Sequence, residues 1–343
     1  MTDNKPSLAE WRALYQAADE FKKLAPWQWM WDRDIFGVKN PDDGSIGYCC
    51  VMGAGGEHFA LGVYLGDQGL AGYLAIQTER LTAKNAIFFQ TVLMASFENA
   101  DLVEKEDREI IRKLELSFRG RNAWPLFRIY EPNFLPWFIN SKQAIFLTQC
   151  FTQANNIALR FQKKPNLFKP LLKNQVLVRE QTPDGTWRDT HINPFPLSAK
   201  IPETISPQQP DDKMVERLKK QETTPLVLEI DIFLSASPVA NKDGRPFFPY
   251  LSLIVEHNSG FVVGFELKER HELLLDFPNL VGKHLEKSPF GLPAKILVKN
   301  NETAEAIFPL AKILDIEIEL TKKLPALAAA KRSLKQFNAF NLI

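Results

Sequence analysis

A run of prolines divides this chain of 343 residues into two parts. The stretch from residue 193 to 225 is polar and holds Pro194, Pro196, Pro202, Pro207, Pro210 and Pro225. Proline fixes φ and removes a backbone donor, so neither a long helix nor a central strand is expected to run through this stretch. We expect a linker there, with one short helix at most. The predicted organisation is a first domain over 1–200, a Pro-rich linker over 201–224 and a second domain over 225–343.

Length and composition allow each part a core of its own, because 45% of the residues are hydrophobic. The net charge of +1 excludes the strongly basic surface of a protein dedicated to coating nucleic acid. Cys49, Cys50 and Cys150 form neither a disulfide framework nor a CxxC pair, which favours a reducing compartment. The N-terminus has no apolar leader and no stretch approaches about 18 apolar residues. We therefore expect a cytoplasmic protein with no membrane contact.

The glycine-rich stretch CVMGAGGEHFALGVYLG, residues 50–66, raises the question of a phosphate-binding loop. In such a loop the glycines open a helix whose N-terminus holds the phosphate. Here the segments 46–52 and 58–65 both have strand patterns, and no Gly-Lys-Ser or Gly-Lys-Thr follows. We therefore assign Gly53, Gly55 and Gly56 to a hairpin turn that needs positive φ.

The rest of the first part mixes helix and strand patterns, which predicts an α+β domain. Ser7 and Glu10 form a capping box at the start of a helix that ends before Pro26. Ser141 is predicted to cap a long amphipathic helix that extends through residue 161. Further expected elements are helices over 68–79 and 105–116, a strand over 86–97, and a hairpin of 176–180 with 186–191.

Alternating tryptophans form the first candidate binding surface. Trp27, Trp29 and Trp31 come just before Asp32 and Asp34. Aromatic rings beside paired acids could line a ligand cleft, or they could form one face of a packed segment. We favour packing, because large aromatic side chains are mostly buried.

Arginines among aromatic residues form the second candidate surface. The stretch SFRGRNAWPLFRIYEPNFLPWF, residues 117–138, contains Arg119, Arg121 and Arg128. Such a mixture can stack nucleic-acid bases or bind an acidic partner. The alternative, which we favour, is a loop whose arginines are solvated or paired with nearby acids.

The second part has three strand patterns followed by alternating helix and strand patterns. Strands are predicted over 226–235, 247–256, 261–267, 294–299 and 316–320, and helices over 272–286, 302–314 and 324–340. This is the element order of an RNase H-like core with a mixed sheet. The segments LEIDIFLS, FPYLSLIVEHNSGFVVGFELK and GLPAKILVKNNETAEAIF resemble parts of integrase and transposase cores of that fold. The predicted fold class is an α+β domain followed by an α/β RNase H-like domain.

This resemblance implies a cluster of carboxylates, which in those nucleases holds two Mg²⁺ ions. Asp231 matches the first acid, whereas a gap-free alignment places the second on Asn300. No Asp or Glu follows Glu319, so the acid expected on the last helix is missing. We therefore expect a catalytically silent domain with no metal and no cofactor, in which Asp231 is satisfied by a backbone N–H or an arginine. The alternative is a metal site of Asp231 with Glu229, on the same strand face, or Glu256.

The tail from residue 321 onward is basic and includes Lys331 and Arg332. Such a helix can contact a phosphate backbone or an acidic protein surface, but it is more often a solvated face. Both parts together also resemble a bacterial family of two-domain proteins of unknown function. The stretches EWRALYQAADEFKKLAPWQWMWDRDIFGV and LPAKILVKNN carry that resemblance, which implies no activity.

No motif in the chain supplies a recognised catalytic or metal site. The five histidines lack metal-ligand spacing, and neither a nucleophile elbow nor a kinase-like set of motifs is present. Our first hypothesis is a cytosolic binding or adaptor protein that is not an enzyme. The alternatives are a metal-dependent nuclease or hydrolase and a nucleic-acid binder without catalysis. Whether the partner is a protein or a nucleic acid stays open.

Overall fold

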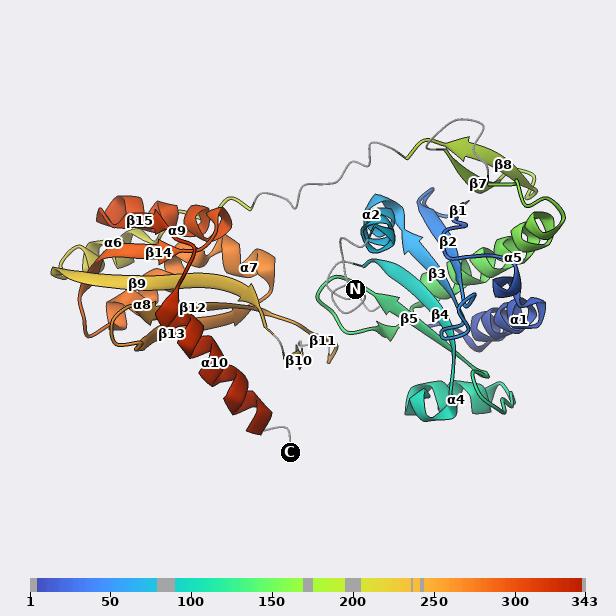
Figure 1. Cartoon of the computed structure of the whole chain (residues 1–343), viewed down its shortest axis with the longest axis horizontal. Coiled ribbons are helices and arrows are strands. Elements are labelled where there is room, and N and C mark those ends of the chain that lie inside the picture. Colours follow the sequence, from blue (N-terminus) through green and yellow to red (C-terminus); the bar gives the residue numbers. More distant parts are fainter. Residues whose placement is uncertain are drawn as a thin grey trace. The chain divides into compact units, whose positions relative to one another are not determined.

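The structure, a computed structural model, describes residues 5–78, 90–168, 175–194, 205–235, 237–240 and 244–340, with side chains up to residue 333. The chain forms two compact units, Met1–Lys200 and Ile201–Ile343. Each unit combines helices with a mixed sheet (Figure 1). No helix of the described segments is long and apolar enough to span a bilayer.

The first unit contains an eight-stranded sheet with the order β6-β5-β4-β3-β2-β1-β7-β8. All neighbouring strands are antiparallel except β1 and β7, which are parallel. The strands are β1 Phe36–Lys39, β2 Ile46–Met52, β3 Ala60–Leu65, β4 Val92–Glu98, β5 Trp124–Tyr130, β6 Trp137–Phe138, β7 Val176–Gln181 and β8 Trp187–Ile192. The predicted strand over 86–97 begins later, at Val92, and residues 86–89 lie outside the described segments.

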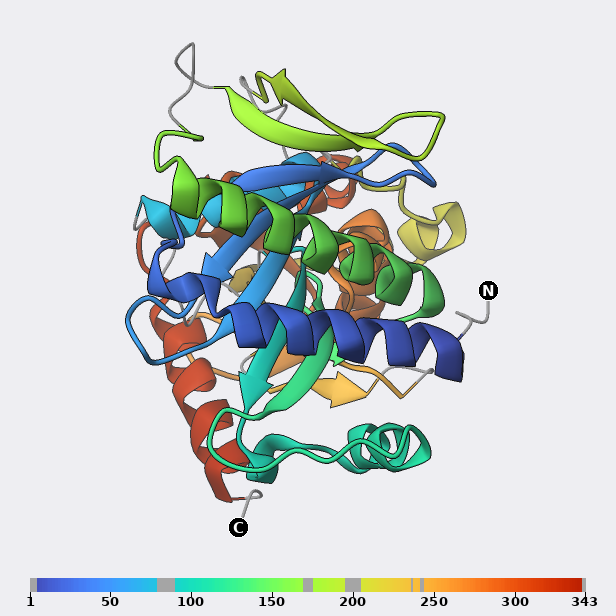
Figure 2. The same ribbon diagram turned by 90° about the vertical axis from the view of Figure 1, so that its right-hand side faces the viewer.

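Helices cover both faces of this sheet. They are α1 Leu8–Leu24, α2 Gly66–Gln77, α4 Lys105–Lys113 and α5 Ser141–Lys163, with short 3-10 turns η1 Pro26–Gln28 and η2 Ala100–Leu102. α1 and α5 lie side by side across one face (Figure 2). There they bury Phe21 and Phe151 against strand residues such as Leu61 and Leu93. α2 packs on the opposite face, where Tyr73 meets Tyr64.

Capping side chains determine where α1 and α5 begin. The Ser7 hydroxyl accepts from the Glu10 N–H while the Glu10 carboxylate accepts from the Ser7 N–H, which confirms the predicted capping box. For α5 the predicted cap was wrong by one residue. Asn140, not Ser141, is the N-cap, and its side-chain oxygen accepts from the Gln143 N–H at 2.9 Å.

The glycine-rich stretch is a hairpin turn between two antiparallel strands. Met52 at the end of β2 pairs with Ala60 at the start of β3, so no helix follows the glycines. Gly53 and Gly56 have φ of +129° and +78°, whereas Gly55 has no positive φ. The predicted turn is therefore confirmed, with two of the three glycines in the conformation that favours glycine.

The second unit is built on a five-stranded sheet with the order β13-β12-β9-β14-β15. β12 is antiparallel to both of its neighbours, β9 and β13, whereas β14 is parallel to β9 and β15 is parallel to β14. These strands are β9 Thr223–Leu234, β12 Tyr250–Glu256, β13 Val262–Lys268, β14 Leu292–Val298 and β15 Glu317–Leu320, and a separate pair consists of β10 Val239–Ala240 and β11 Pro246–Phe247. All five strands predicted from the sequence are present in the main sheet.

Helices flank both faces of the second sheet as well. They are α6 Asp212–Leu218, α7 Arg270–Leu275, α8 Phe277–Lys287, α9 Asn301–Leu314 and α10 Pro325–Phe340. The first four bury one face, around Ile230 and Ile296. α10 covers the other face, where Leu327 packs near Leu253 and Val255. In Figure 1 α10, in red, starts beside β9 and β12, and its far end extends beyond the sheet.

Two features of this unit differ from the sequence-based expectations. The predicted linker, 201–224, contains the one short helix that was allowed for, α6, but this helix packs on α8: a Cβ added at Gly282 would lie 2.4 Å from the Met214 sulfur. α6 therefore belongs to the core of the second unit. The helix predicted over 272–286 is broken at Asp276, because Pro278 has no N–H and cannot continue a helix from α7.

We predict that Gly53→Ala destabilises the first unit by about 2 kcal/mol, because the positive φ disfavours a side chain and the new methyl group would lie 2.6 Å from the Phe59 ring. Gly55→Ala is the matched control, because a methyl group there meets no atom within 4 Å. Urea unfolding followed by tryptophan fluorescence measures this unit alone, since all seven tryptophans lie between residues 11 and 187. Equal midpoints for the two variants would contradict the prediction.

Candidate functional site

Two acidic side chains lie in the middle of the second sheet, on its central strand β9. Glu229 and Asp231 are two residues apart, so both project from the face opposite to Ile230. As whole residues, Glu229 and Asp231 are only 0% and 6% exposed. Carboxylates buried to this extent require hydrogen bonds or a counter-charge, so their partners define what the site can do.

Glu229 holds the start of α10 against the sheet. Its carboxylate accepts from the backbone N–H groups of Leu327 at 2.7 Å and Ala326 at 3.4 Å, and it contacts Nδ1 of His257 at 2.6 Å. The first N–H groups of a helix have no partner within the helix and carry its positive dipole end. Glu229 therefore caps α10 from almost 100 residues away in the sequence.

Asp231 is paired with a lysine one turn further along the same helix. The Lys331 ammonium lies 2.7 Å from Oδ2 of Asp231 and 3.4 Å from the centre of the Phe233 ring. The three alternate residues of β9, 229, 231 and 233, thus all bind α10. The side chains of Asp231 and Lys331 are 9% and 27% exposed, so water screens this pair less than a surface pair.

Glu256, the remaining candidate acid, is occupied within its own hairpin. Its carboxylate accepts from the N–H groups of Asn258 and Ser259 in the turn between β12 and β13. Although burial alone would raise its pKa, the hydrogen bonds from Ser259 and Asn258 hold the pKa of Glu256 below the ordinary glutamate value. Across the segments that the structure describes, no three His, Cys, Asp or Glu side chains gather closely enough to hold a metal ion.

Asn300 has a structural role at the start of α9. It is the N-cap of this helix, and its side-chain oxygen accepts from the Thr303 N–H at 2.8 Å. Asparagine and aspartate cap helices about equally well. The amide at this position therefore preserves the cap while removing the negative charge that the nuclease resemblance would place there.

The basic residues of the tail have different environments. Lys331 faces the sheet, whereas Arg332, the next residue, is exposed. The expected solvated basic face thus includes Arg332 but not Lys331, which is the counter-charge of Asp231. The sequence predicts an arginine or a backbone N–H as the partner of Asp231, whereas the partner is this lysine; the pair spans 100 residues, so no local pattern indicates it.

In the first unit the three candidate tryptophans do not form one surface. Trp27 packs against Phe59 with ring centroids 4.9 Å apart, and the Trp29 indole N–H donates to the Ala158 carbonyl at 3.1 Å. Trp31 is 53% exposed, with the Arg33 guanidinium near its ring. Two of the three rings therefore pack inward, in and beside a 3-10 turn rather than along an extended segment.

The two acids next to these tryptophans also have separate partners. The Asp34 carboxylate accepts from the Trp31 N–H at 2.8 Å within a local turn. The Asp32 side chain accepts from Gln77, while its backbone carbonyl accepts from the Tyr73 hydroxyl at 2.9 Å. Asp34 thus stabilises a local turn, and Asp32 contacts α2.

The arginine-rich stretch divides into a loop and a strand. Arg119 and Arg121 are exposed in the loop before β5. Arg128 lies within β5, not in the predicted loop, and is buried. Its guanidinium binds both oxygens of Asp107, at 3.0 and 2.6 Å, and stacks on Phe138. Arg128 therefore connects α4 to the sheet, whereas Arg119 and Arg121 are exposed in the loop before β5.

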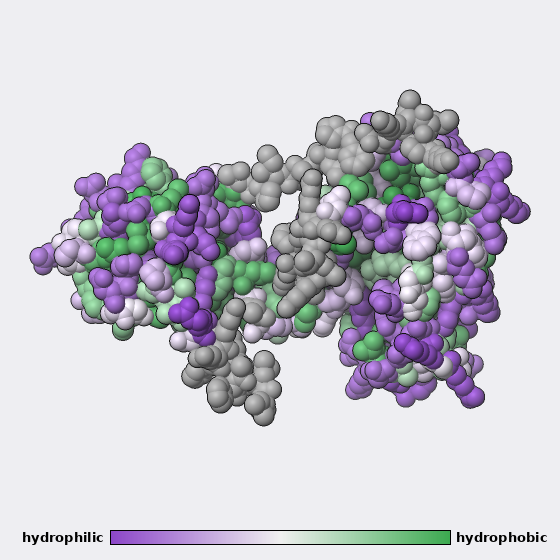
Figure 3. Space-filling model, in the orientation of Figure 1, coloured by the Kyte–Doolittle hydropathy of each residue, from purple (hydrophilic) through white to green (hydrophobic). Residues whose placement is uncertain are grey.

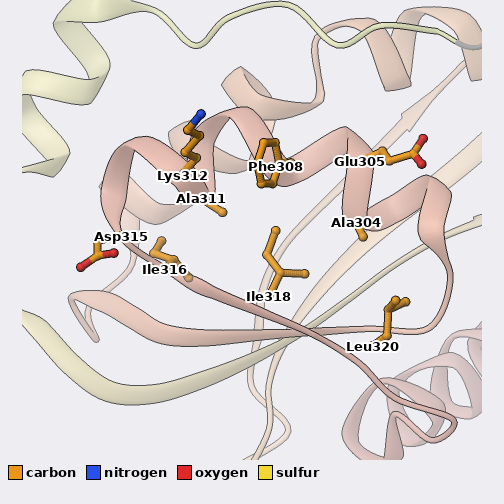
Figure 4. A pocket seen from close by; sticks show the side chains of 9 residues that line it. All are labelled: Ala304, Glu305, Phe308, Ala311, Lys312, Asp315, Ile316, Ile318 and Leu320. Atoms are coloured by element: carbon orange, nitrogen blue, oxygen red, sulfur yellow. The ribbon is translucent and has the colours of Figure 1, made fainter.

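A surface groove, which the sequence patterns did not indicate, runs between α9 and the edge strand β15. It encloses about 500 Å³ and has an apolar lining that includes Ala304, Phe308, Ala311, Ile318 and Leu320 (Figure 4). Phe308 and Leu320 are more than half exposed, at 54% and 55%. The space-filling view shows hydrophobic residues at the surface of this unit among hydrophilic ones (Figure 3).

Together, the fold and these contacts define a protein of two mixed α/β units in which the two buried acids of β9 bind a helix of the same unit. Residues 11–179 match a family model described as Domain of unknown function (DUF7309), and residues 214–335 match Domain of unknown function (DUF6930). No curated protein matches the chain. The second match begins within α6 and ends after Lys331, so the partners described above for Glu229 and Asp231 lie within the matched segment.

We predict that Lys331→Met lowers the free energy of unfolding of the second unit by about 1–3 kcal/mol, because Asp231 is left buried without a counter-charge. Asp231→Asn in the Lys331→Met background should recover part of that loss. Urea unfolding measured by far-UV circular dichroism and amide exchange of residues 324–333 test both statements. The exposed Lys322→Met is the matched control. Strictly additive effects of the two substitutions in a double-mutant cycle would contradict a direct pair.

Proposed function

We propose that this protein is a binding or adaptor protein without catalytic activity, and that its second unit is an RNase H-like domain. The strand order β13-β12-β9-β14-β15, in which β12 runs antiparallel to the other four strands, supports the fold assignment. So does the helix between β14 and β15. The three buried free thiols support a place in the cytoplasm.

The main argument against catalysis is the position of the Lys331 ammonium, 2.7 Å from the Asp231 carboxylate. Two-metal nucleases need several carboxylates to neutralise the ions and position water. Here a divalent cation bound to Asp231 would lie next to the Lys331 ammonium and would be repelled by it strongly. The cation would therefore have to displace Lys331. It would find few further ligands, because Glu229 is engaged by α10 and His257, and Glu256 by its own turn.

Binding of nucleic acid without cleavage is a second candidate function. The exposure of Arg119, Arg121 and Arg332 favours it, because guanidinium groups in water-accessible positions can reach phosphates. The near-neutral charge of the chain argues against a large phosphate-binding surface. The apolar groove of the second unit therefore makes a protein partner the better-supported choice.

The expected result of a nuclease assay is no cleavage. Single-stranded, duplex and RNA–DNA hybrid substrates are incubated with the full chain and Mg²⁺ or Mn²⁺, and products are resolved by gel. The Lys331→Ala variant should also be inactive, since removing the ammonium adds no carboxylate. Cleavage that disappears in Asp231→Ala but persists in the exposed-acid control Glu317→Ala would overturn the proposal and establish a working metal nuclease.

A binding assay separates the two candidate functions. Labelled oligonucleotides that bind in a salt-dependent manner, and more weakly to Arg119→Ala, would favour the nucleic-acid binder over the protein adaptor.

A further inference from the structure

The edge of the second sheet beside β15 is open. β15 is hydrogen-bonded to β14 alone, and no further strand of the described segments lies on its other side. The Thr321 N–H donates to Val298 on β14, and the direction of backbone groups alternates along a strand. The N–H and C=O groups of Ile318 and Leu320 therefore point away from β14, toward the open edge.

The groove lies where the side chains of one additional strand would go. Ile318 and Leu320 form its floor and rim on β15, and Phe308 overhangs them from α9 (Figure 4). Ala304 and Ala311 are four residues before and three residues after Phe308, so they share its face of the helix. Their small side chains leave the space that a larger residue would fill. A strand added at β15 would place alternate side chains in this apolar space.

The opposite face of the same edge is acidic. Glu317 and Glu319 are exposed and share one cation, Lys295, at 3.2 and 2.8 Å. The groove side adds two acids, Glu305 and Asp315, and one base, Lys312. Four carboxylates thus lie near two ammonium groups along Glu317–Leu320 and the groove, which leaves a net negative charge at the strand itself, and the exposed Lys322 and Lys323 follow beyond its end.

We propose that this edge binds an extended segment of a partner protein in which apolar residues alternate with Lys or Arg. The apolar residues enter the groove and contact Phe308, while the basic residues pair with Glu317 and Glu319 across the new strand pair. The inference names the partner class for the adaptor function proposed above and rests on that proposal. A second copy of this chain fits poorly, because pairing β15 with itself would place glutamates opposite glutamates.

The test uses fluorescein-labelled hexapeptides and fluorescence anisotropy with the full chain. The probe alternates valine with lysine. One comparison peptide replaces every lysine by glutamate, and another has the same composition with the valines and lysines in separate blocks. The alternating basic peptide should bind at least about tenfold more tightly than either comparison peptide. Its affinity should fall as salt rises. Equal binding of all three peptides would overturn the proposal.

Variants locate the site. Phe308→Ala should weaken binding about tenfold, whereas Phe265→Ala should not, although Phe265 on the other sheet edge is similarly exposed at 58% against 54%. The double variant Glu317→Lys with Glu319→Lys should lose the basic peptide and gain the acidic one. Both glutamates are exposed, and thermal unfolding by circular dichroism checks that the fold is kept. Equal weakening by Phe308→Ala and Phe265→Ala would overturn the assignment.

Sedimentation velocity tests whether a second copy of this chain, rather than a partner protein, binds the β15 edge. A dimer that is lost in Phe308→Ala would show that this edge binds a second copy, and would overturn the proposal. A monomer that binds the alternating peptide supports it. The nuclease assay is decided by Asp231 on β9 and uses Glu317 of β15 only as a control. Cleavage would therefore refute the proposed absence of catalysis, whereas failure of peptide binding would refute only the partner class.

Discussion

Two carboxylates buried in the centre of a sheet impose the strongest constraint on the second unit. Burying Glu229 and Asp231 is unfavourable unless their oxygens are hydrogen-bonded or paired with positive charge. One helix meets both needs, with its first N–H groups on Glu229 and the Lys331 ammonium on Asp231. The same helix covers the apolar residues Leu253 and Val255. Polar and apolar requirements therefore place α10 in the same position.

Local patterns in the sequence were sufficient to predict most of the elements. The Ser7 and Glu10 capping box, the glycine turn after β2 and the five main strands of the second unit each depend on residues a few positions apart. Element boundaries were less accurate, as the N-cap of α5 shows. Asn140 and Ser141 are both good caps, and only the backbone conformation distinguishes them.

Contacts between distant residues could not be predicted in this way. The pairing of Asp231 with Lys331 and of Arg128 with Asp107 depends on which helix packs on which strand. Arg128 lies in an aromatic, loop-like stretch, and nothing in its neighbours indicates that an acid on α4 will neutralise it. The linker prediction failed to place α6 in a core for a similar reason. Prolines and charges dominate residues 201–224, and the few apolar residues that pack on α8 are a weak signal.

The contact between Asp231 and Lys331 has a consequence for how this unit responds to its surroundings. In a metal centre the neutralising charge comes from solution, so chelators and changes in ion supply alter both fold and activity. Here the counter-ion is covalently part of the chain, and its effective concentration beside the carboxylate does not depend on the medium. The counter-charge of Asp231 is therefore encoded in the polypeptide itself, and neutralising this carboxylate does not require a divalent cation from the medium.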